Sequence, residues 1–553
     1  MPRGGEAPSL YLGLDSSTQS LSAVVVEVAG ADRRVVFETS LDFDASLPDY
    51  GTRHGVLPRT VPEVAESSPL MWAEALDAVM ARLGASGLDL HRLAAISGSA
   101  QQHGSVYLRA DMASRLAALD PRQGLVTQVA PMLSRTVSPI WMDSSTTSQC
   151  AEIVEAVGGQ QVLAARTGSR AFERFTGPQI RKFFQQDPDG YAATGRVHLV
   201  SSFLASLLAG QESPVDPGDA SGMNLMDLAS TQWWPPAVEA TAPGLAAKLP
   251  PVAPASTVVG TLAPYWQARH GLPAATVVVW SGDNPCSLIG VGLVREGRAA
   301  MSLGTSDTIF GLMKKPSVDP GGTGHVFGAP TGDYMGLTCF ANGSLAREHV
   351  RDQYSLDWAG FSEALGATPP GNRGRVLLPW FGPEITPHVT TAGAHRYGGL
   401  RADQAAANVR AVVEGQMMAM ALHSRWMSVN FDTIHATGGA AVNLQILQVV
   451  ADVFGADVHR VEVGNSAALG AALRALHADR LAAGAPLSWD EVVAGLVEPT
   501  AGSGAAPDRG RHATYRELMP LYEACETHAL GRGPDPSPQL TMFGSTGSRD
   551  GQG

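Results

Sequence analysis

The chain has 553 residues, of which 44% are hydrophobic and 16% charged, and its net charge is −13. That length allows two or more domains with substantial cores, and the acidic balance disfavours general binding to nucleic acid or anionic membranes. We expect neither a membrane helix, which needs ~20 apolar residues, nor a signal peptide. The four cysteines (Cys150, Cys286, Cys339 and Cys525) have no paired spacing. They are typical of reduced thiols, so we expect a cytoplasmic protein.

The first half of the chain predicts alternating strands and helices. Apolar runs at residues 10–14, 21–28 and 34–39 predict three consecutive strands that form a meander. A helix should follow, with Trp72, Leu76, Val79 and Leu83 on one face. Buried strands are predicted at 93–97 and 277–280, and the Pro- and Ala-rich residues 243–259 predict a surface connection.

The second half, from about residue 290, predicts a strand at 432–436, then Gly438-Gly439, then a helix. The inward face of that helix should carry Leu444, Leu447, Ala451 and Phe454. A last amphipathic helix should be capped by Asn465 or Ser466. Residues 502–510 predict a loop, and the Gly-, Ser- and Pro-rich residues after about 532 predict disorder.

Two segments have the same pattern of a strand, a tight turn of small and hydroxyl residues, and a second strand. The first contains Asp15-Ser-Ser-Thr18-Gln19, and the second contains Gly304-Thr305-Ser-Asp-Thr308. Such turns let backbone N–H groups and short hydroxyls approach an anion. Gly438-Gly439 should likewise let a ligand press against backbone before a helix. Together these features predict a duplicated domain that holds a polyphosphate between its halves.

The order of these three features, with several longer motifs, carries a family resemblance. The motifs are Gln101-Gln102-His103-Gly104, Trp141-Met-Asp143-Ser-Ser-Thr-Thr, Arg170-Ala-Phe-Glu-Arg174, Ser281-Gly-Asp283-Asn284-Pro285 and Leu378-Pro-Trp-Phe-Gly-Pro-Glu384. From about residue 11 to 477, the chain resembles the FGGY carbohydrate kinases, most closely the xylulose kinases of the animal-like branch. The resemblance implies an α/β, two-lobed actin-like ATPase fold (ribonuclease H-like), duplicated around a central cleft. We expect an N-terminal sugar-binding lobe at 1–290, a C-terminal nucleotide-binding lobe at 291–531 and a disordered tail at 532–553.

The resemblance also implies a reaction, the ATP-dependent phosphorylation of D-xylulose to D-xylulose 5-phosphate in pentose catabolism, with Mg²⁺. Two alternatives remain open: a kinase for another pentulose, such as ribulose, or for a polyol, and a non-catalytic sugar sensor on the same fold. The presence of both Asp15 and Asp283 argues against the sensor. The partners expected are the small sugar and ATP, with no nucleic acid or membrane, in a monomer or homodimer.

Asp283 is the candidate catalytic base, because it lies at a predicted strand-to-helix junction before Pro285. The alternative role for this motif is helix capping, which Asn284 would fill and which leaves Asp283 unexplained. A helix N-terminus should also keep the Asp283 carboxylate ionised near neutral pH. The resemblance places Asp283 and Asn284 at the sugar.

Asp15 is the candidate magnesium residue, usually through water, although an Asp before Ser-Ser-Thr is more often a turn former. The resemblance places Thr18 and Gln19 near the γ-phosphate. Ser17 stands where the family commonly has Gly, so this turn should avoid positive φ or accept strain.

His103 and Arg174 are the remaining sugar-site candidates, and both rest on the resemblance. A lone His is more often structural, and Arg174 could instead pair with Glu173 or a residue one helical turn away. Arg170 is the alternative to Arg174. The family often has Asp where this chain has Ser201-Ser202, and this departure bears on the choice of sugar.

The nucleotide candidates come from the second half of the chain. The resemblance assigns Gly304, Thr305, Gly438, Gly439 and Asn443 to the nucleotide and suggests Trp358 as a neighbour of adenine. Asn443 could instead be an ordinary helical residue, and a large aromatic such as Trp358 is more often part of a core.

Overall fold

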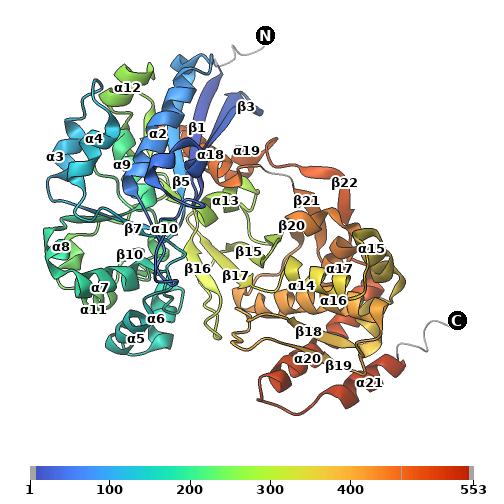
Figure 1. Ribbon diagram of the computed structural model, residues 1–553. Coiled ribbons are helices and arrows are strands. Elements are labelled where there is room, and N and C mark those ends of the chain that lie inside the picture. The colour runs from blue at the N-terminus through green and yellow to red at the C-terminus, as the bar shows by residue number, and fades with distance from the viewer. Residues whose placement is uncertain (1–7, 462–463, 547–553) are drawn as a thin grey trace, which may run out of the picture.

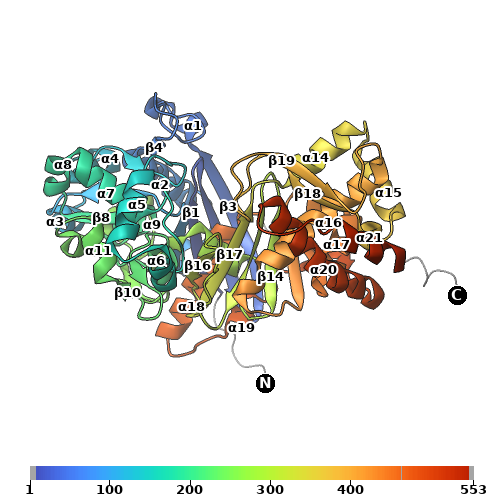
Figure 2. The same cartoon turned by 90° about the horizontal axis from the view of Figure 1, so that it is seen from below.

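The structure, a computed structural model, describes residues 8–461 and 464–546, which form two lobes that each contain a seven-stranded sheet (Figure 1); Figure 2 shows the same two lobes from below. The strands of the first sheet are β1 (Ser9–Ser16), β2 (Ser20–Ala29), β3 (Asp32–Asp42), β5 (Leu93–Ala100), β11 (Val258–Thr261), β12 (Thr276–Val278) and β13 (Ser281–Gly282). The strands of the second are β14 (Arg298–Leu303), β15 (Asp307–Met313), β16 (His325–Gly328), β17 (Tyr334–Phe340), β20 (Thr433–Thr437), β21 (Asp457–Val461) and β22 (Pro499–Ala505).

The two sheets repeat one topology. The first has the order β11-β12-β5-β1-β2-β3, and the second has the order β22-β21-β20-β14-β15-β17-β16. In each sheet a hairpin strand, β1 or β14, pairs antiparallel with the next strand and parallel with a strand from later in that half, β5 or β20. The turns close at Ser16 opposite Leu21 and at Leu303 opposite Asp307. The predicted duplication of an α/β unit is therefore confirmed.

Short ribbons and helices complete both lobes. The remaining strands are β4 (Glu66–Ser67), β6 (Ser105–Leu108), β7 (Ser138–Pro139), β8 (Arg196–Leu199), β9 (Met226–Asp227), β10 (Gln232–Trp233), β18 (Val376–Trp380) and β19 (Gly393–Tyr397). The helices of the first half are α1 (Phe43–Ser46), α2 (Pro69–Gly84), α3 (Met112–Ala117), α4 (Leu125–Val129), α5 (Thr147–Ala156), α6 (Gln160–Thr167), α7 (Thr176–Gln186), α8 (Pro188–Ala193), α9 (Val200–Ala209), α10 (Pro217–Ser221), α11 (Pro235–Thr241), α12 (Pro264–His270) and α13 (Asp283–Gly290). Those of the second half are α14 (Ser344–Gln353), α15 (Trp358–Ala367), α16 (Ala405–His423), α17 (Leu444–Phe454), α18 (Ser466–Ala482), α19 (Trp489–Val493), α20 (Arg509–Ala529) and α21 (Ser537–Thr546).

Two helices, α18 and α13, pack against each other where the two halves of the chain meet. The orange-red helix α18 comes from the second half of the chain but lies beside β1 of the first sheet, as Figure 1 shows and as the packing of Leu469 and Leu473 on Tyr11 confirms. Helix α13 of the first half packs through Leu288 on the second sheet and through Ile289 on the cluster that contains Tyr11. The two helices cross at Gly470, where a Cβ would lie 1.9 Å from the carbonyl oxygen of Cys286. Only glycine permits this approach.

Several predicted elements are confirmed, among them the meander, the strand at 93–97 and helix α2, in which Trp72 and Leu76 are buried. The predicted inward face of α17 is partly wrong: Leu444 is 51% exposed, and Ile446 and Val450 are buried instead. Leu444, the first residue of α17, therefore points to solvent, and the buried apolar face of the helix begins two positions later, at Ile446.

Two predictions near the C-terminus need correction. Residues 502–505, expected in a loop, belong to β22, which pairs antiparallel with β21 at the edge of the second sheet. Residues 537–546, expected to be disordered, form α21 with Leu540 fully buried, because this apolar residue finds a place in the core of the second lobe. Residues 547–553 of the same predicted tail lie outside the described residues.

The predicted lobe boundary at 290/291 falls between the last strand of the first sheet, which ends at Gly282, and the first strand of the second, which begins at Arg298. Because α18 lies on the first sheet, a division by sequence alone separates it from the sheet that it covers. The boundary stays a prediction. In the described residues no helix is both long and apolar enough to cross a membrane.

Candidate active site

Asp283 is the first residue of α13, directly after β13, whose strand pairing with β5 brings this helix start to the end of the first sheet. Its Oδ1 accepts hydrogen bonds from the backbone N–H of Asn284 (2.8 Å) and from the Asn284 side chain (2.9 Å). The expected capping role of Asn284 is wrong, because the N-cap is Gly282 and Asn284 lies inside the helix. The Asn284 amide instead links Asp283 to Gln102 Oε1, at 2.8 Å.

The ionisation of Asp283 differs from the expectation based on the helix N-terminus. Burial, and then the negative charge of Asp15, raise the pKa of Asp283 to about 7. A helix terminus contributes at most ~2 kcal/mol in favourable geometry, whereas complete burial can raise a carboxyl pKa by several pH units. Near neutral pH, the candidate base is therefore divided between its charged and neutral forms.

Asp15 lies near the end of β1, opposite Ser22 of β2 and Ser99 of β5. Burial raises the pKa of Asp15 to about 6, and its Oδ1 is buried without a hydrogen-bond partner in the described residues. A carboxylate oxygen of this kind suits a hydrated Mg²⁺, which usually keeps several waters and takes one or two carboxylates. The described residues contain no cluster of three or more His, Cys, Asp or Glu side chains arranged as a metal site, so such an ion would depend on phosphate oxygens as well.

His103 lies in the loop after β5, with a φ of 72° that is uncommon for a residue with a side chain. Its Nδ1 donates to the carbonyl oxygen of Gly222 (2.7 Å), and its ring stacks on Phe175 at 4.5 Å between centroids. Burial, and then the charge of Arg174, lower the pKa of His103 to about 3. The imidazole is therefore neutral, and Nε2 is its hydrogen-bond acceptor.

Arg174 joins the same group of side chains. Its guanidinium lies 4.9 Å from the ring centroid of Phe172 and 5.8 Å from that of Phe175, and burial lowers its pKa. It does not pair with Glu173, which instead accepts a hydrogen bond from Thr147 (3.3 Å). The structure thus brings the four predicted sugar-site residues into one chain of contacts through Gln102 and Phe175. Arg170 also lies over Phe172, but it lines a separate pocket of about 750 Å³ together with Asp319 and His388.

Most of the predicted nucleotide residues line one pocket of about 520 Å³ in the second lobe. These are Gly304, Thr305, Trp358, Gly439 and Asn443. Trp358 is 43% exposed, which excludes the alternative that it belongs to the core. Asn443 caps α17 by accepting from the backbone N–H groups of Gln445 (3.0 Å) and Ile446 (3.3 Å), so it has a structural role as well as a place in the pocket.

Three predicted residues lie elsewhere. Gly438 is not among the lining residues; it has a φ of 89° and packs on Leu303, which does line the pocket, and a Cβ at Gly438 would lie 2.6 Å from the Leu303 carbonyl oxygen. Thr18 and Gln19 belong to the turn of the first lobe, where the Thr18 hydroxyl accepts a hydrogen bond from Trp141 Nε1 (2.8 Å). Ser17 is not among the described residues with positive φ, so the turn accommodates it without the conformation that favours glycine.

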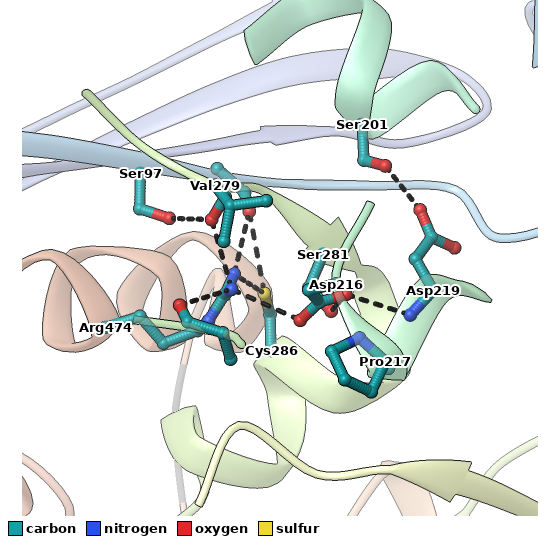
Figure 3. A network of polar contacts seen from close by, with 12 residues as sticks. Ser97, Ser201, Asp216, Pro217, Asp219, Val279, Ser281, Cys286 and Arg474 are labelled. Atoms are coloured by element: carbon teal, nitrogen blue, oxygen red, sulfur yellow. Dashed lines mark hydrogen bonds and ion pairs between the residues drawn. The ribbon is translucent and has the colours of Figure 1, made fainter. Parts of the chain in front are cut away.

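A buried polar network lies beside the predicted sugar-site residues (Figure 3). Arg474 of α18 pairs with Asp216, the N-cap of α10, at 3.3 Å. Asp216 Oδ1 also accepts from Ser281 (2.8 Å), two residues before Asp283, and from the backbone N–H of Asp219 (2.9 Å). Helix α10 and its C-cap residue thereby hold the two carbonyl groups, of Gly218 and Gly222, that accept hydrogen bonds from Gln102 and His103.

The same network explains why a serine is accommodated at position 201, in the segment where the family often has Asp. Ser201 donates to the carboxylate of Asp219, and burial, with the charges of Asp216 and Asp283, raises the pKa of Asp219 well above its usual value. A second carboxylate at position 201 would add another buried negative charge here, which a hydroxyl avoids.

Sequence reasoning missed several contributors to both parts of the site. Gln102 lies in a motif that already pointed to the site, so its role was open to inference. Arg347 and Ser344 line the nucleotide pocket, and Arg347 forms a fully buried ion pair with Asp307 (2.7 Å). His325 contacts Arg174 across 151 residues of sequence, and no local pattern signals such a contact.

This arrangement defines a class of protein: a two-lobed α/β enzyme with a carboxylate base candidate in one lobe and a nucleotide-sized pocket in the other. Residues 132–290 match the N-terminal domain of the FGGY family of carbohydrate kinases, and residues 299–478 match its C-terminal domain. The chain is also 42% identical to xylulose kinase of Rattus norvegicus over 536 residues, which cover 95% of this chain and 98% of the relative. The chain therefore belongs to the FGGY family of carbohydrate kinases.

Solved structures agree on the fold, which is the actin-like ATPase fold expected from the sequence. Xylulose kinase from Rhodospirillum rubrum superposes with a TM-score of 0.76 at 22% identity, covering 94% of this chain and 99% of the other. Gluconate kinase from Lactobacillus acidophilus superposes with a TM-score of 0.77 at 20% identity, covering 95% and 98%. Because structures named for different sugars fit equally well, the fold does not select the substrate.

Proposed function

We propose that this carbohydrate kinase transfers the γ-phosphoryl group of ATP to D-xylulose and forms D-xylulose 5-phosphate. The observation that carries the proposal is the continuous chain of contacts from Asp283 and Asn284 through Gln102 and His103 to Phe175 and Arg174. The 42% identity to a xylulose kinase supports the choice of sugar.

In the proposed reaction, Asp283 accepts the proton of the attacking sugar hydroxyl. Both hydrogen bonds from Asn284 go to Oδ1, so Oδ2 is the oxygen that we assign to this proton. His103 and Arg174 hold the sugar: the neutral His103 offers Nε2 as an acceptor, and the Arg174 guanidinium offers only donors. Holding the hydroxyl and the base in a reactive geometry supplies much of the rate enhancement in phosphoryl transfer.

On the nucleotide side, we assign adenine to Trp358 and the phosphates to the two hairpin turns, with Thr18 and Gln19 from one lobe and Gly304 and Thr305 from the other. Gly439 and Asn443 complete the pocket, and Gly438 packs on Leu303, one of its lining residues. Asp15 would hold Mg²⁺, which in this reaction neutralises the charge that develops on the phosphoryl oxygens. We also propose a reducing compartment such as the cytoplasm, because the four cysteines are free, and a monomer or homodimer.

A panel of acceptors tests the proposal. With ATP and Mg²⁺, D-xylulose should give the highest kcat/KM, ahead of D-ribulose, L-ribulose, xylitol, glycerol and gluconate. His103→Ala should raise the KM for the ketose roughly tenfold with little change in the KM for ATP, since an unpaired sugar hydroxyl costs ~1–3 kcal/mol. A higher kcat/KM for another acceptor would identify that acceptor as the substrate in place of D-xylulose. ATP binding without turnover of any acceptor would favour the alternative of a non-catalytic sugar sensor.

A further inference from the structure

A guanidinium in the sugar site has a neutral partner. Arg174 is largely withdrawn from water, and its Nη2 lies 3.0 Å from Nε2 of His325. A buried cation is usually paired with a carboxylate, because removing its hydration is costly. Its hydrogen-bond acceptor here is an imidazole rather than a carboxylate, so the guanidinium remains available to an incoming oxygen-rich ligand.

The hydrogen bonds determine the tautomer of His325. A guanidinium has donors and no acceptor, so Nε2 of His325 must accept from Arg174 and must carry no proton. The ring proton is then on Nδ1, which donates to the hydroxyl of Ser169 at 3.1 Å. Burial, and then the charge of Arg174, lower the pKa of His325 well below its usual value, so the ring remains neutral in the physiological range.

The two partners come from different lobes. His325 is the first residue of β16, in the second sheet, whereas Ser169 and Arg174 lie in the segment that joins α6 to α7 in the first lobe. The backbone N–H of Val326 donates to the carbonyl oxygen of Gly168 (3.0 Å), so β16 is docked against this segment. Figure 1 shows β16 between the lobes, next to α10.

We propose that His325 is a positioning residue of the sugar site: the second lobe supplies its imidazole to hold the Arg174 guanidinium in the orientation that receives the ketose. One nitrogen of Arg174 is held, and the other donors remain for sugar oxygens. The sugar site is then complete only while β16 is docked on residues 168–174. The proposal rests on the proposed function in one respect, the contact of Arg174 with the ketose.

A purely structural role for His325 makes a different prediction. The ring packs against Phe172 at 4.7 Å and Phe175 at 5.7 Å between centroids, so it also fills an aromatic cluster. Phenylalanine at position 325 would preserve this packing and remove the acceptor. Glutamine would lose the ring but could restore an acceptor through its amide oxygen. The two substitutions therefore separate packing from hydrogen bonding.

The experiment is a double-mutant cycle with a matched control. Wild type, His325→Phe, His325→Gln, Arg174→Met and the double variant His325→Phe/Arg174→Met are compared for kcat and for the KM of D-xylulose and ATP. The control is His349→Phe, which changes a histidine of the second lobe outside the sugar site; its ring lies tilted to that of Phe381, 4.2 Å between centroids.

We expect His325→Phe to raise the KM for D-xylulose roughly tenfold, with the KM for ATP unchanged, as for loss of one hydrogen bond to a charged group. His325→Gln should recover part of that loss, and the double variant should be no worse than Arg174→Met. The control should match wild type. Additive effects in the double variant, equal increases in both KM values, or better function with Phe than with Gln would overturn the proposal.

A measurement without turnover separates this inference from the proposed function. In protein labelled with ¹⁵N-histidine, the His325 ring should show an unprotonated Nε2 whose shift changes in Arg174→Met but not in His349→Phe. An Nε2 that carries a proton would refute the positioning role even if D-xylulose is the substrate. If the expected shifts are found but D-xylulose is not phosphorylated, the proposed function fails, and the cycle is measured with whichever acceptor is turned over.

Discussion

The raised pKa of Asp283 makes a testable connection between catalysis and stability. Asp283→Asn replaces the carboxylate with a group of nearly the same shape, and its Oδ1 can keep both hydrogen bonds from Asn284. The asparagine side chain at position 283 carries no charge at any pH. We therefore expect it to be more stable than wild type at alkaline pH, although it loses the base and at least ~10²-fold in kcat.

The magnitude follows from proton linkage. Because the pKa of Asp283 is about 7 in the folded protein and 3.8 in the reference state, the folded state holds more protons between these values. The free energy of unfolding of wild type therefore falls as the pH rises through this window, and the loss is complete above about pH 7. Between pH 5 and pH 8, the loss amounts to roughly 2–3 kcal/mol, since each pH unit inside the window costs about 1.4 kcal/mol.

Urea unfolding at pH 5 and pH 8 measures this difference, since the shift in midpoint between isosteric variants reports the change in stability. The advantage of Asp283→Asn over wild type should grow by roughly 2–3 kcal/mol between the two pH values. Asp77→Asn is the matched control, because the pKa of Asp77 is shifted in the opposite direction from that of Asp283. Burial alone would raise the pKa of Asp77, but His270 and Arg269 outweigh burial and lower it, so the neutral variant should be less stable at pH 8.

Two outcomes would refute this reasoning. If the stability difference between Asp283→Asn and wild type is the same at pH 5 and pH 8, the carboxyl pKa is not raised in the folded protein. If the Asn variant is the less stable protein at pH 8, the negative charge contributes favourably, and the stabilising effect of the helix N-terminus exceeds the cost of burial.

Three further predictions concern the nucleotide and the lobes. Asp15→Asn should shift the magnesium dependence of the rate to higher concentration, because one negative charge near the ion is lost; an unchanged curve would leave Asp15 as a turn residue. Trp358→Ala should raise the KM for ATP roughly tenfold without affecting that for the sugar, since adenine would lose an aromatic neighbour; equal effects on both would contradict this. Sugar and ATP together should lower the radius of gyration in small-angle scattering more than either alone, because a site shared by two lobes favours closure; four identical radii would argue against it.

The sequence by itself determined the class of this protein. Three features are local patterns that can be recognised from the sequence alone. They are the two hairpins with their hydroxyl-rich turns, the Gly-Gly turn after a strand, and the motif around Asp283. They predicted the duplicated α/β fold, and the family resemblance that they carry assigned Gly304, Thr305, Gly439 and Asn443 to the nucleotide. The structure places these four residues in one pocket.

Only the tertiary structure decided the properties that depend on distant neighbours. The helix start at Asp283 suggested an ionised carboxylate, but burial and the charge of Asp15, 268 positions away, reverse that expectation. Leu540, in the tail that was predicted to be disordered, lies in a helix because its side chain is buried in the core of the second lobe. The partner of Arg174 comes from the other lobe. The burial of a group and the charges around it depend on residues that are distant in the sequence and close only in the folded protein. A local sequence pattern therefore does not predict them.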